Sequence, residues 1–256
     1  MFYTARQTEI VALARSEGRV TVDELAARFS VSPQTIRKDL NDLCDARALT
    51  RVHGGAVFPG GNENVRYEAR RSMASSEKQE IGRAAAAIIS SNASLFINIG
   101  TTTEAVSEAL IDHDELMVIT NNINVANRLR LSERIEVVIA GGVVRRSDGG
   151  IVGEAAVDFI RQFKVDFAVI GVSAIDEDGA LLDFDYREVK VAQAIIANAR
   201  HVILVSDSSK FERTAPVRIG HLGQVHTFIT DHCPSDRIRA LCAESDVRLI
   251  ETRPAA

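Results

Sequence analysis

The sequence predicts an α/β protein of two domains, a small helical domain with a β-hairpin and a larger domain built around a mostly parallel sheet. Three short helical patterns followed by a glycine-containing hairpin occupy residues 1–58. From about residue 77, short apolar strands alternate with helical patterns, which is how a parallel sheet covered on both faces is built. Residues 59–76 are expected to be a linker, because Pro, Gly and polar residues dominate its first half without an apolar period. The larger domain is then expected at residues 77–256.

Length and composition are those of an ordinary globular protein. The chain has 256 residues, of which 46% are hydrophobic and 25% charged, and this balance excludes a disordered chain. No apolar run approaches the roughly 20 residues that span a bilayer, and the N-terminus lacks the apolar stretch of a signal peptide. Three cysteines without CxxC spacing argue against a disulfide framework. We therefore expect a cytoplasmic protein that makes no membrane contact.

Histidine and cysteine spacing predicts no metal site. The residues His221, His226, His232, Cys233 and Cys242 fit no standard zinc pattern, and alternate strand and loop positions account for them. Neither a Walker A sequence nor GxGxxG occurs. No metal and no cofactor is therefore expected.

The first domain has the pattern of a winged helix-turn-helix. Thr21 and Glu24 form a capping box at the start of its second helix. Ser32 caps the third helix and Pro33 takes the first helical position, after a turn of about three residues. Two helices joined by so short a turn, the second N-capped and basic, form a helix-turn-helix, and the hairpin at residues 48–58 adds a wing.

Charge is distributed unevenly along the chain. The net charge is −5, yet residues 1–57 contain eight basic and seven acidic residues, so the acidic excess lies in the rest of the sequence. A near-neutral head on an acidic body is compatible with DNA binding, where the local placement of cations matters more than net charge.

Polar and basic side chains of the third helix lie off its buried stripe and are candidates for reading DNA. Gln can bond adenine, Arg guanine, Thr a thymine methyl group and Lys a phosphate. The alternative is a solvated polar face, which the caps, the turn length and the wing disfavour. Wing residues would touch phosphate or the minor groove, although a tight turn alone explains the wing glycines. The predicted contacts are Ser32, Gln34, Thr35, Arg37, Lys38, Arg51 and His53.

The body is predicted as alternating strands and helices. Strands are expected at residues 95–99, 116–120, 135–140, 166–170, 202–205, 226–229 and 247–250. Helices are expected at residues 78–89, 104–110, 124–131, 154–163, 187–199 and 236–243. Ligands of such sheets bind beyond the carboxyl ends of the strands, so the loops that follow the strands are the places to look for a site.

The loop after the first body strand has the composition of a phosphate site. Gly100, Thr101, Thr102 and Thr103 precede a helix, so hydroxyl groups and backbone N–H groups gather at its N-terminus. The alternative is a plain threonine cap, for which one threonine would suffice.

The remaining loops after strands combine polar side chains with glycines, which suggests a small polyhydroxylated ligand. Turn chemistry explains the glycines singly but not an arginine among them, and Lys210 is equally well explained as a phosphate ligand or as a solvated lysine. The predicted effector contacts in these loops are Asn121, Arg145, Asp148, Gly149, Gly150, Asp183, Asp185, Glu188 and Lys210.

Two motifs of the head, residues 29–40 (FSVSPQTIRKDL) and 53–56 (HGGA), resemble the DeoR family of transcriptional repressors. The resemblance continues nearly end to end, at residues 99–102, 120–122, 140–142, 148–150 and 207–211. It implies a ribose-5-phosphate-isomerase-like effector domain that binds phosphorylated metabolites and has no catalytic activity. Residues 122–127 and 184–189 further resemble members that respond to glycerol 3-phosphate, which implies a repressor of glycerol catabolism relieved by that metabolite.

One departure from the family pattern lies in a helix of the body. The family often has a Lys-Arg pair where this chain has Ala192 and Gln193, so any contact made by that pair, such as one at a subunit interface, is not implied for this chain.

Two further expectations concern assembly and catalysis. A single head reads only a few base pairs, so we expect operator DNA to be bound by a homo-oligomer, a dimer or a tetramer, assembled through the body. The rival function is a sugar-phosphate isomerase with an appended DNA-binding head, for which Asp148, Glu154, Glu188 and Lys210 would supply acid and base groups. An isomerase needs a base within reach of a substrate carbon, whereas a sensor needs only hydrogen-bonding partners.

Overall fold

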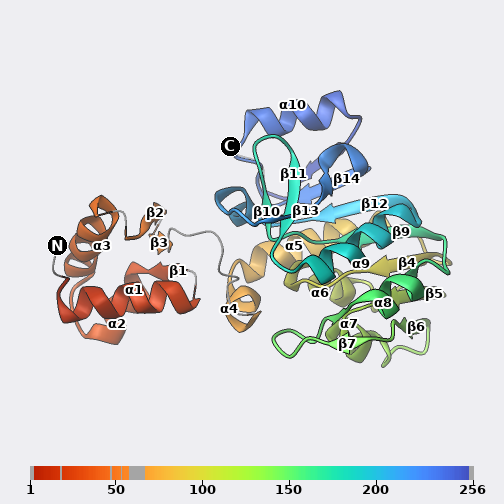
Figure 1. Cartoon of the computed structure of the whole chain (residues 1–256), viewed down its shortest axis with the longest axis horizontal. Helices are drawn as coiled ribbons and strands as arrows, with labels where there is room; N and C mark the ends of the chain where they lie inside the picture. Colours follow the sequence, from red (N-terminus) through yellow and green to blue (C-terminus); the bar gives the residue numbers. More distant parts are fainter. Residues whose placement is uncertain (1–2, 18, 47, 53, 58–66, 254–256) are drawn as a thin grey trace. The chain divides into compact units, whose positions relative to one another are not determined.

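The computed structural model describes residues 3–17, 19–46, 48–52, 54–57 and 67–253 (Figure 1). The chain forms two compact units, Met1–Met73 and Ala74–Ala256. In the part of the chain that is described, no helix is both long and apolar enough to cross a membrane.

Unit 1 contains the predicted three helices and the hairpin. Its elements are α1 (Ala5–Glu17), β1 (Arg19–Thr21), α2 (Val22–Phe29), α3 (Pro33–Asp45), β2 (Thr50–Val52), β3 (Gly55–Val57) and α4 (Tyr67–Ser72). The strands form an antiparallel sheet in the order β1-β3-β2, in which β1 is an addition to the predicted hairpin. Ile10, Ile36, Leu40 and Leu43 are fully buried and hold α1 against α3.

Unit 2 is built around a seven-stranded sheet in the order β15-β14-β12-β9-β4-β5-β6, in which every neighbouring pair is parallel. The strands are β4 (Ser94–Ile97), β5 (Leu116–Thr120), β6 (Ile135–Ile139), β9 (Val165–Ile170), β12 (Ala199–Val205), β14 (Thr227–Thr230) and β15 (Arg248–Glu251). The helices are α5 (Ser75–Ala86), α6 (Thr101–Ala109), α7 (Ile123–Leu129), α8 (Glu154–Ile160), α9 (Tyr186–Ala197) and α10 (Asp236–Glu244). All predicted strands and helices of the body are present, with ends that differ by a few residues.

The helices cover the two faces of this sheet in two groups. Side chains alternate along each strand, so that Leu95 and Ile97 of β4 join one buried cluster while Phe96 joins the other. Helices α5, α6 and α7 pack on the first cluster, and α8, α9 and α10 pack on the second. The sheet is therefore covered on both faces, as the alternation of strands and helices predicts.

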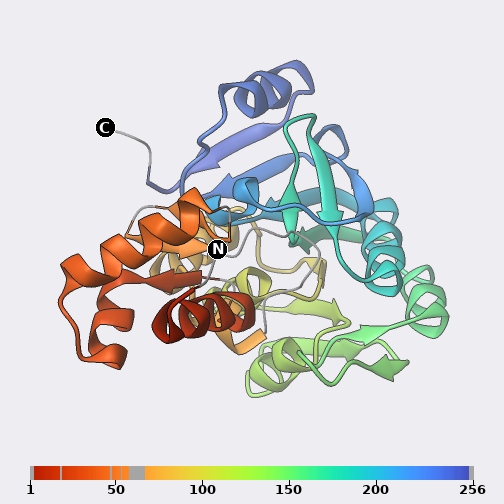
Figure 2. The same cartoon turned by 60° about the vertical axis from the view of Figure 1, so that its left-hand side comes forward.

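A small antiparallel sheet, absent from the sequence prediction, joins β10 (Ala174–Ile175), β11 (Ala180–Asp183) and β13 (Val217–His221). A second pair joins β7 (Val143–Val144) to β8 (Ile151–Val152), and short 3-10 helices lie at η1 (Ser208–Glu212) and η2 (Leu222–Gln224). Figure 2 shows the β10–β11 hairpin beside α10, where the Gly179 turn approaches Leu241. The strands β7, β8 and β10 have only two residues each, too few for a period-2 pattern to reveal them.

The expected linker at residues 59–76 differs from the structure in its second half. Residues 67–72 form α4, and α5 begins at Ser75 rather than at residue 78, while residues 58–66 lie outside the described part of the chain. Ala74, directly before α5, has a φ of 49°, in the left-handed region. Unit 2 thus begins with a left-handed residue directly before α5.

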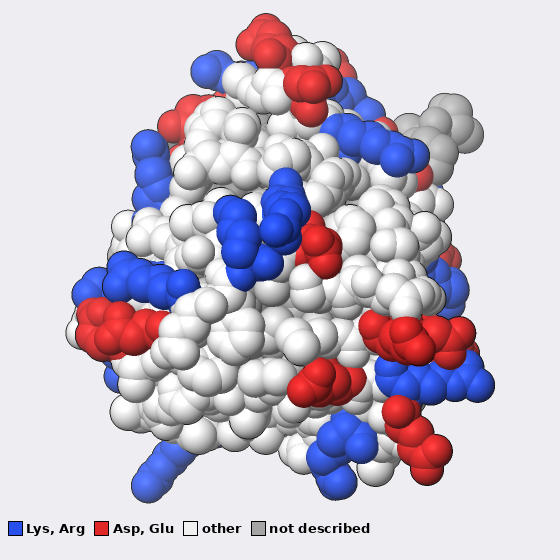
Figure 3. All heavy atoms as spheres, turned by 90° about the vertical axis from the view of Figure 1, so that its right-hand side faces the viewer, with Lys and Arg blue, Asp and Glu red and all other residues white. Residues whose placement is uncertain are grey.

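Charges of both signs lie interspersed on the face that unit 2 presents on the right of Figure 1, which Figure 3 shows. Basic and acidic side chains are neighbours there, separated by broad uncharged areas, and no extended basic area of the kind that binds nucleic acid is visible on this face.

Candidate functional site

Helix α3 begins at a fixed residue and is anchored by an apolar stripe. The Ser32 side chain accepts a hydrogen bond from the backbone N–H of Thr35 at 3.2 Å, and Pro33 occupies the first turn, as predicted. On the inner face Ile36 and Leu40 are fully buried. The orientation of the helix is therefore set by its core contacts, which leaves the opposite face available for recognition.

The predicted DNA-reading residues of α3 lie on that opposite face. Gln34, Arg37 and Lys38 are exposed, and Thr35 is half-buried beside the cap. The Arg37 guanidinium donates a hydrogen bond to Oε1 of Gln34 at 3.3 Å, so the two side chains lie together on one turn. These residues form one polar and basic row.

The wing is held close to the rest of unit 1 by a glycine. A Cβ on Gly55 would lie 2.0 Å from the carbonyl oxygen of Val20, so β1 and β3 approach as closely as they do only because this position lacks a side chain. Arg51 of β2 is exposed and remains a candidate for a phosphate contact. His53 lies outside the described residues, and its contact stays a prediction.

Some of the predicted effector residues of unit 2, at Gly100 to Thr103, Asn121 and Lys210, follow parallel strands whose carboxyl ends share one edge of the sheet. At the start of α6, Gly100 is the N-cap residue and offers no side-chain cap. The first intrahelical bond runs from the Glu104 N–H to the Gly100 carbonyl, so the N–H groups of Thr101 to Thr103 precede the helical ladder. The Thr103 hydroxyl donates to the carbonyl oxygens of Asn98 and Gly100 at 2.7 and 2.8 Å. Its side chain therefore fixes the turn.

Amide side chains join this turn to the neighbouring loops. Nδ2 of Asn122 and Nδ2 of Asn124 donate to the buried Glu104 carboxylate at 3.1 and 3.0 Å. Nδ2 of Asn121 donates to the Ile151 carbonyl at 3.1 Å, while its fully buried Oδ1 has no hydrogen-bond partner among the residues described. Asn121 was predicted from the sequence. The sequence analysis did not single out Glu104 or Asn124. A glutamate at the start of a helix is commonly a capping residue, and an asparagine within a helix is commonly solvated.

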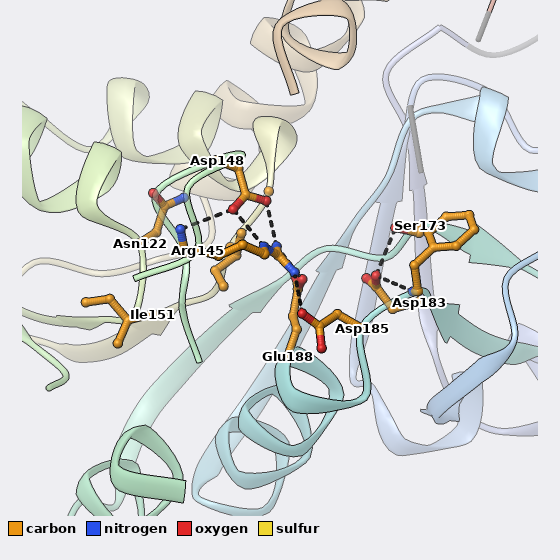
Figure 4. Close-up of polar contacts among 12 residues, drawn as sticks. Asn122, Arg145, Asp148, Ile151, Ser173, Asp183, Asp185 and Glu188 are labelled. Atoms are coloured by element: carbon orange, nitrogen blue, oxygen red, sulfur yellow. Dashed lines mark hydrogen bonds and ion pairs between the residues drawn. The ribbon is translucent and has the colours of Figure 1, made fainter. Parts of the chain in front are cut away.

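Arg145 gathers three predicted carboxylates around one guanidinium (Figure 4). Its Nε and Nη2 donate to the two oxygens of Asp148 at 2.9 and 2.6 Å. Its Nη1 lies 3.3 Å from Oδ2 of Asp185, and Nη2 lies 2.6 Å from Oε2 of Glu188. We call these four residues the carboxylate cluster. The structure thus brings together side chains from a loop after β6 and from the start of α9.

Burial and like charge shift the acidity of this cluster. Burial, reinforced by the repulsion of the nearby Asp183 carboxylate, raises the pKa of Glu188 to about 8 against the opposing effect of Arg145. Burial would lower the pKa of Arg145, but hydrogen bonds and ion pairs with Asp148 and Glu188 raise it well above its usual value. The guanidinium therefore stays charged at every pH at which the protein is folded.

Three further predicted residues shape the surroundings of the carboxylate cluster. Asp183 accepts hydrogen bonds from the Ser173 hydroxyl at 3.1 Å and from the Phe184 N–H at 2.6 Å. Gly149 and Gly150 lie beside the start of α7, where the Gly149 carbonyl accepts from the Ile123 N–H and Gly150 forms a bridge with Asn122. A Cβ on Gly150 would meet the Ile99 side chain at 2.5 Å, so this loop packs directly on the end of β4.

A second group of charges lies at the end of β12. Lys210 is 7% exposed and Asp207 is 2% exposed, and Nζ of Lys78 lies 3.9 Å from Oδ2 of Asp207 while being 4% exposed as a residue. We call Lys78, Asp207 and Lys210 the lysine cluster. Burial would raise the pKa of Asp207, but Lys210 and Lys78 outweigh it and lower that pKa below its usual value. Lys78 was missed from the sequence because a lysine on an amphipathic helix reads as a solvated residue.

The four acid and base candidates of the rival isomerase do not converge in the structure. Glu154 lies on the surface and pairs with Nζ of Lys190, whereas Asp148 and Glu188 are engaged by Arg145. Lys210 belongs to the lysine cluster at another strand end. Of the four candidates, only Asp148 and Glu188 therefore lie together, and Arg145 pairs with both.

Solved structures of similar fold add little. Ribose 5-phosphate isomerase A from Methanocaldococcus jannaschii is 14% identical, with a TM-score of 0.40 over 54% of this chain and 55% of that chain. A similarity of this size bears on neither the activity nor the ligand of this chain.

Relatives of known description are far more similar. The chain is 45% identical over 249 residues to the glycerol-3-phosphate regulon repressor of Escherichia coli (strain K12), covering 97% of this chain and 99% of that protein. It is 46% identical over 241 residues to the repressor of the same description from Haemophilus influenzae, covering 94% of each. Both are transcriptional repressors by name and not enzymes. Residues 6–60 match the DeoR-like helix-turn-helix domain and residues 73–232 match the DeoR C terminal sensor domain, so the chain belongs to the DeoR family.

Proposed function

We propose that the protein is a DNA-binding repressor of genes for glycerol and glycerol 3-phosphate catabolism, and that binding of glycerol 3-phosphate relieves the repression. The observation that carries this proposal is the exposed row of Gln34, Arg37 and Lys38 on a capped helix of a DeoR-family chain. The two relatives named as glycerol-3-phosphate regulon repressors support the choice of metabolite.

The DNA contacts divide into reading and positioning. Arg37 and Gln34, joined by their hydrogen bond, suit guanine and adenine edges in the major groove, and the Thr35 methyl group suits a thymine. Lys38 and the Ser32 cap region would contact phosphates, and Arg51 and His53 of the wing would contact phosphate or the minor groove; phosphate contacts position the head without reading sequence. Specificity is then concentrated in the first turns of α3.

The effector contacts divide into a phosphate end and a hydroxyl end. The backbone N–H groups of Thr101 to Thr103 and the hydroxyls of Thr101 and Thr102 offer a helix N-terminus to the phosphate, with Lys210 as a cation. The carboxylate cluster, Asn121 and the loop of Gly149 and Gly150 offer acceptors and donors to the hydroxyl groups. Effector binding relieves repression only if the ligand has a higher affinity for the state that does not bind DNA.

Self-association is part of the proposal. A head of this size reads a few base pairs, so operator specificity requires at least two heads on repeated half-sites. Exposed apolar side chains at the sheet edge formed by β6 and the adjoining β7, namely Ile139, Val143 and Val144, supply surface for contact between unit 2 domains. We infer a homodimer or homotetramer that acts in the cytoplasm, where operator DNA is found.

The proposal is tested with DNA from upstream of the protein's own operon in a gel-shift assay. Glycerol 3-phosphate should weaken the DNA complex, whereas glycerol, which lacks the phosphate, should not. If a different sugar phosphate releases the DNA and glycerol 3-phosphate does not, the proposed metabolite is wrong and the proposed repressor function stands. If the protein isomerises a sugar phosphate and forms no specific DNA complex, the proposed repressor function is wrong.

A further inference from the structure

Strand β6 forms one edge of the seven-stranded sheet, and in the described part of the chain it pairs with β5 alone (Figure 1). The Ala140 N–H, directly after β6, donates to the Thr120 carbonyl of β5 at 2.9 Å, so the even-numbered residues of β6 bond to β5. The backbone groups of Ile135, Val137 and Ile139 therefore point outward, and none of them bonds to a described residue. This edge can accept another strand.

The two edge strands of the sheet differ in their side chains. Strand β15, at the opposite edge, has Arg248 and Glu251 at its ends, and charges of this kind commonly prevent unwanted strand pairing. Strand β6 has isoleucine at both ends, contains neither Pro nor Lys, and pairs with β5 without a bulge. Ile139 is 44% exposed, and Val143 and Val144 of the adjoining β7 are 65% and 48% exposed. The β6 edge thus has the features of a contact surface.

Exposed charges of opposite sign flank the two ends of β6. Glu133 lies two residues before the strand, and Arg146 lies on the loop that follows β7. Both side chains are exposed, and neither forms an ion pair with a described residue. An identical strand running in the opposite direction would bring its basic end to the acidic end of this one. The edge is therefore complementary in charge to a second copy of itself.

We propose that β6 pairs in the antiparallel direction with β6 of a second copy of this chain, about a twofold axis at Val137, so that two sheets become one. This inference rests on the proposed function, because it names the surface through which the homo-oligomer assembles. Val137 then faces the partner's Val137, and Ile135 faces the partner's Ile139. Residues that face each other in this way exchange two backbone hydrogen bonds, and the contact is the same for both copies.

This pairing also gives the exposed side chains near β6 suitable neighbours. Odd-numbered residues of β6 share one face of the sheet, so the partner's Ile139 packs beside Ile135, close to Leu131, which is 70% exposed on the loop before β6. Glu136 lies on the other face, opposite the partner's Val138, so no like charges face each other. The pairing covers apolar surface without burying an unpaired charge.

The first test measures the mass of the full-length protein by sedimentation equilibrium at micromolar concentration. Ile139→Lys should halve the mass and raise the dissociation constant about a hundredfold or more, because the twofold axis places two unpaired ammonium groups in the contact. Tyr186→Lys is the matched control, since Tyr186 is 62% exposed and belongs to α9. It should keep the mass of the unmodified protein.

Backbone pairing is tested at Val137. Val137→Pro removes an N–H that β5 does not use, so each subunit should keep its sheet while the mass halves. Val137→Ala keeps the N–H and should raise the dissociation constant about tenfold at most. Hydrogen exchange gives a direct reading, because the Val137 N–H should be protected in the unmodified protein and exposed in Ile139→Lys. The Val138 N–H, which bonds to β5, should stay protected in both.

A charge exchange tests the direction of the pairing. Glu133→Arg and Arg146→Glu should each weaken association about tenfold at low salt, because each variant sets like charges against each other across the contact. The double variant restores opposite charges and should associate as the unmodified protein does. Such a recovery cannot come from misfolding, so it decides the question even if Ile139→Lys or Val137→Pro does not fold.

Each of three results would overturn the inference. They are an unchanged mass in folded Ile139→Lys and Val137→Pro, no recovery in the charge-exchanged double variant, and an unmodified protein that is monomeric at micromolar concentration. In all three cases the gel-shift assay still tests the repressor by itself. If Ile139→Lys halves the mass and binds the operator with full affinity, the pairing of β6 is supported, and the requirement for two heads in the proposed function is wrong.

Discussion

Asp39 of α3 accepts a hydrogen bond of 2.6 Å from Nε of Arg6 in α1, and only 6% of its surface is exposed. This pair ties the recognition helix to the first helix across the core of unit 1. Asp42, on the same helix, receives a hydrogen bond from Nε2 of Gln7 at 3.4 Å. Asp39 and Asp42 are thus held toward α1, and the exposed row of Gln34, Arg37 and Lys38 contains no negative charge.

Replacing Asp39 by Asn should loosen α3 without disturbing its sequence-reading face. We expect native-state hydrogen exchange of the α3 amides to become modestly faster, because Arg6 is partly exposed and solvent screens the pair. Asp45→Asn, an exposed substitution on the same helix, is the control and should stay within about 0.5 kcal/mol. Equal protection in both variants would show that the pair contributes nothing to the stability of the helix.

Arg37→Ala should weaken binding to the cognate operator by about 1–3 kcal/mol and relax the preference at one base pair. The loss includes the hydrogen bond that holds the Gln34 side chain beside it. Lys38→Ala is the matched comparison and should weaken all sequences alike, with a shallower dependence on salt. Both are measured by titrating operator variants at two salt concentrations. A uniform loss for Arg37→Ala would identify it as a phosphate contact and leave base reading to Gln34 or Thr35.

Two adjacent glycines of the wing should respond differently to alanine. In Gly55→Ala the new Cβ would meet the Val20 carbonyl oxygen at 2.0 Å, so the strands must separate and operator binding should be lost. Gly54 has open space around its Cβ position but a φ of 75°, so Gly54→Ala should cost only about 1–2 kcal/mol. Circular dichroism and gel shifts on both variants check this. Retained binding by Gly55→Ala would show that β1 and β3 can move apart.

Most helices and strands can be predicted from the sequence, because helix caps and the spacing of apolar residues are local features. The Ser32 cap, the Pro33 start and the alternating strands of the parallel sheet depend on residues within one or two turns of each other. The antiparallel strands β10, β11 and β13 do not, since β10 has only two residues and β13 pairs with a strand more than thirty residues away. Pairing of that kind is decided by tertiary contacts.

The sequence analysis identified most residues of the candidate site that lie in loops, and it did not identify Lys78, which lies on a helix. Arg145, Asp148, Asp185 and Glu188 were singled out one by one, but their convergence on one guanidinium joins residues up to about forty positions apart, which no spacing rule reveals. Lys78 escaped notice because its burial follows from the contact between α5 and the end of β12. Sequence patterns indicate which polar and charged residues lie near strand ends, but their contacts with one another depend on the three-dimensional fold.

Stability should fall as pH rises where Glu188 titrates. Its folded-state pKa is raised to about 8, above the ordinary value of 4.5, so the folded protein holds the proton more tightly than the unfolded chain between these values. The contribution of Glu188 to stability is therefore largest below about pH 4.5 and is lost as pH rises through 8. Thermal unfolding of Glu188→Gln at pH 6 to 9 should show a weaker pH dependence than the unmodified protein. The exposed Glu154, whose pKa is lowered by Lys190, titrates outside this window, so Glu154→Gln should leave the slope unchanged.

The last prediction concerns the effector response. The hydroxyls of Thr101 and Thr102 stand at the start of α6, whereas that of Thr103 is already engaged by two carbonyl groups. In the double variant Thr101→Ala and Thr102→Ala, the phosphate keeps the backbone N–H groups and loses two hydroxyl donors. Each lost donor to a charged oxygen costs about 1.5 kcal/mol, so the glycerol 3-phosphate concentration that releases the operator should rise at least about a hundredfold.

Ser107→Ala is the matched control for this variant, because the Ser107 hydroxyl lies deeper in α6 and donates to the Glu104 carbonyl at 2.7 Å. It should respond to glycerol 3-phosphate at the concentration that releases the unmodified protein. The same gel-shift titration measures all three proteins, and each should bind the operator when the metabolite is absent. If the double variant is released at the ordinary concentration, the phosphate does not contact these hydroxyls, and the start of α6 is a structural cap rather than part of the effector site.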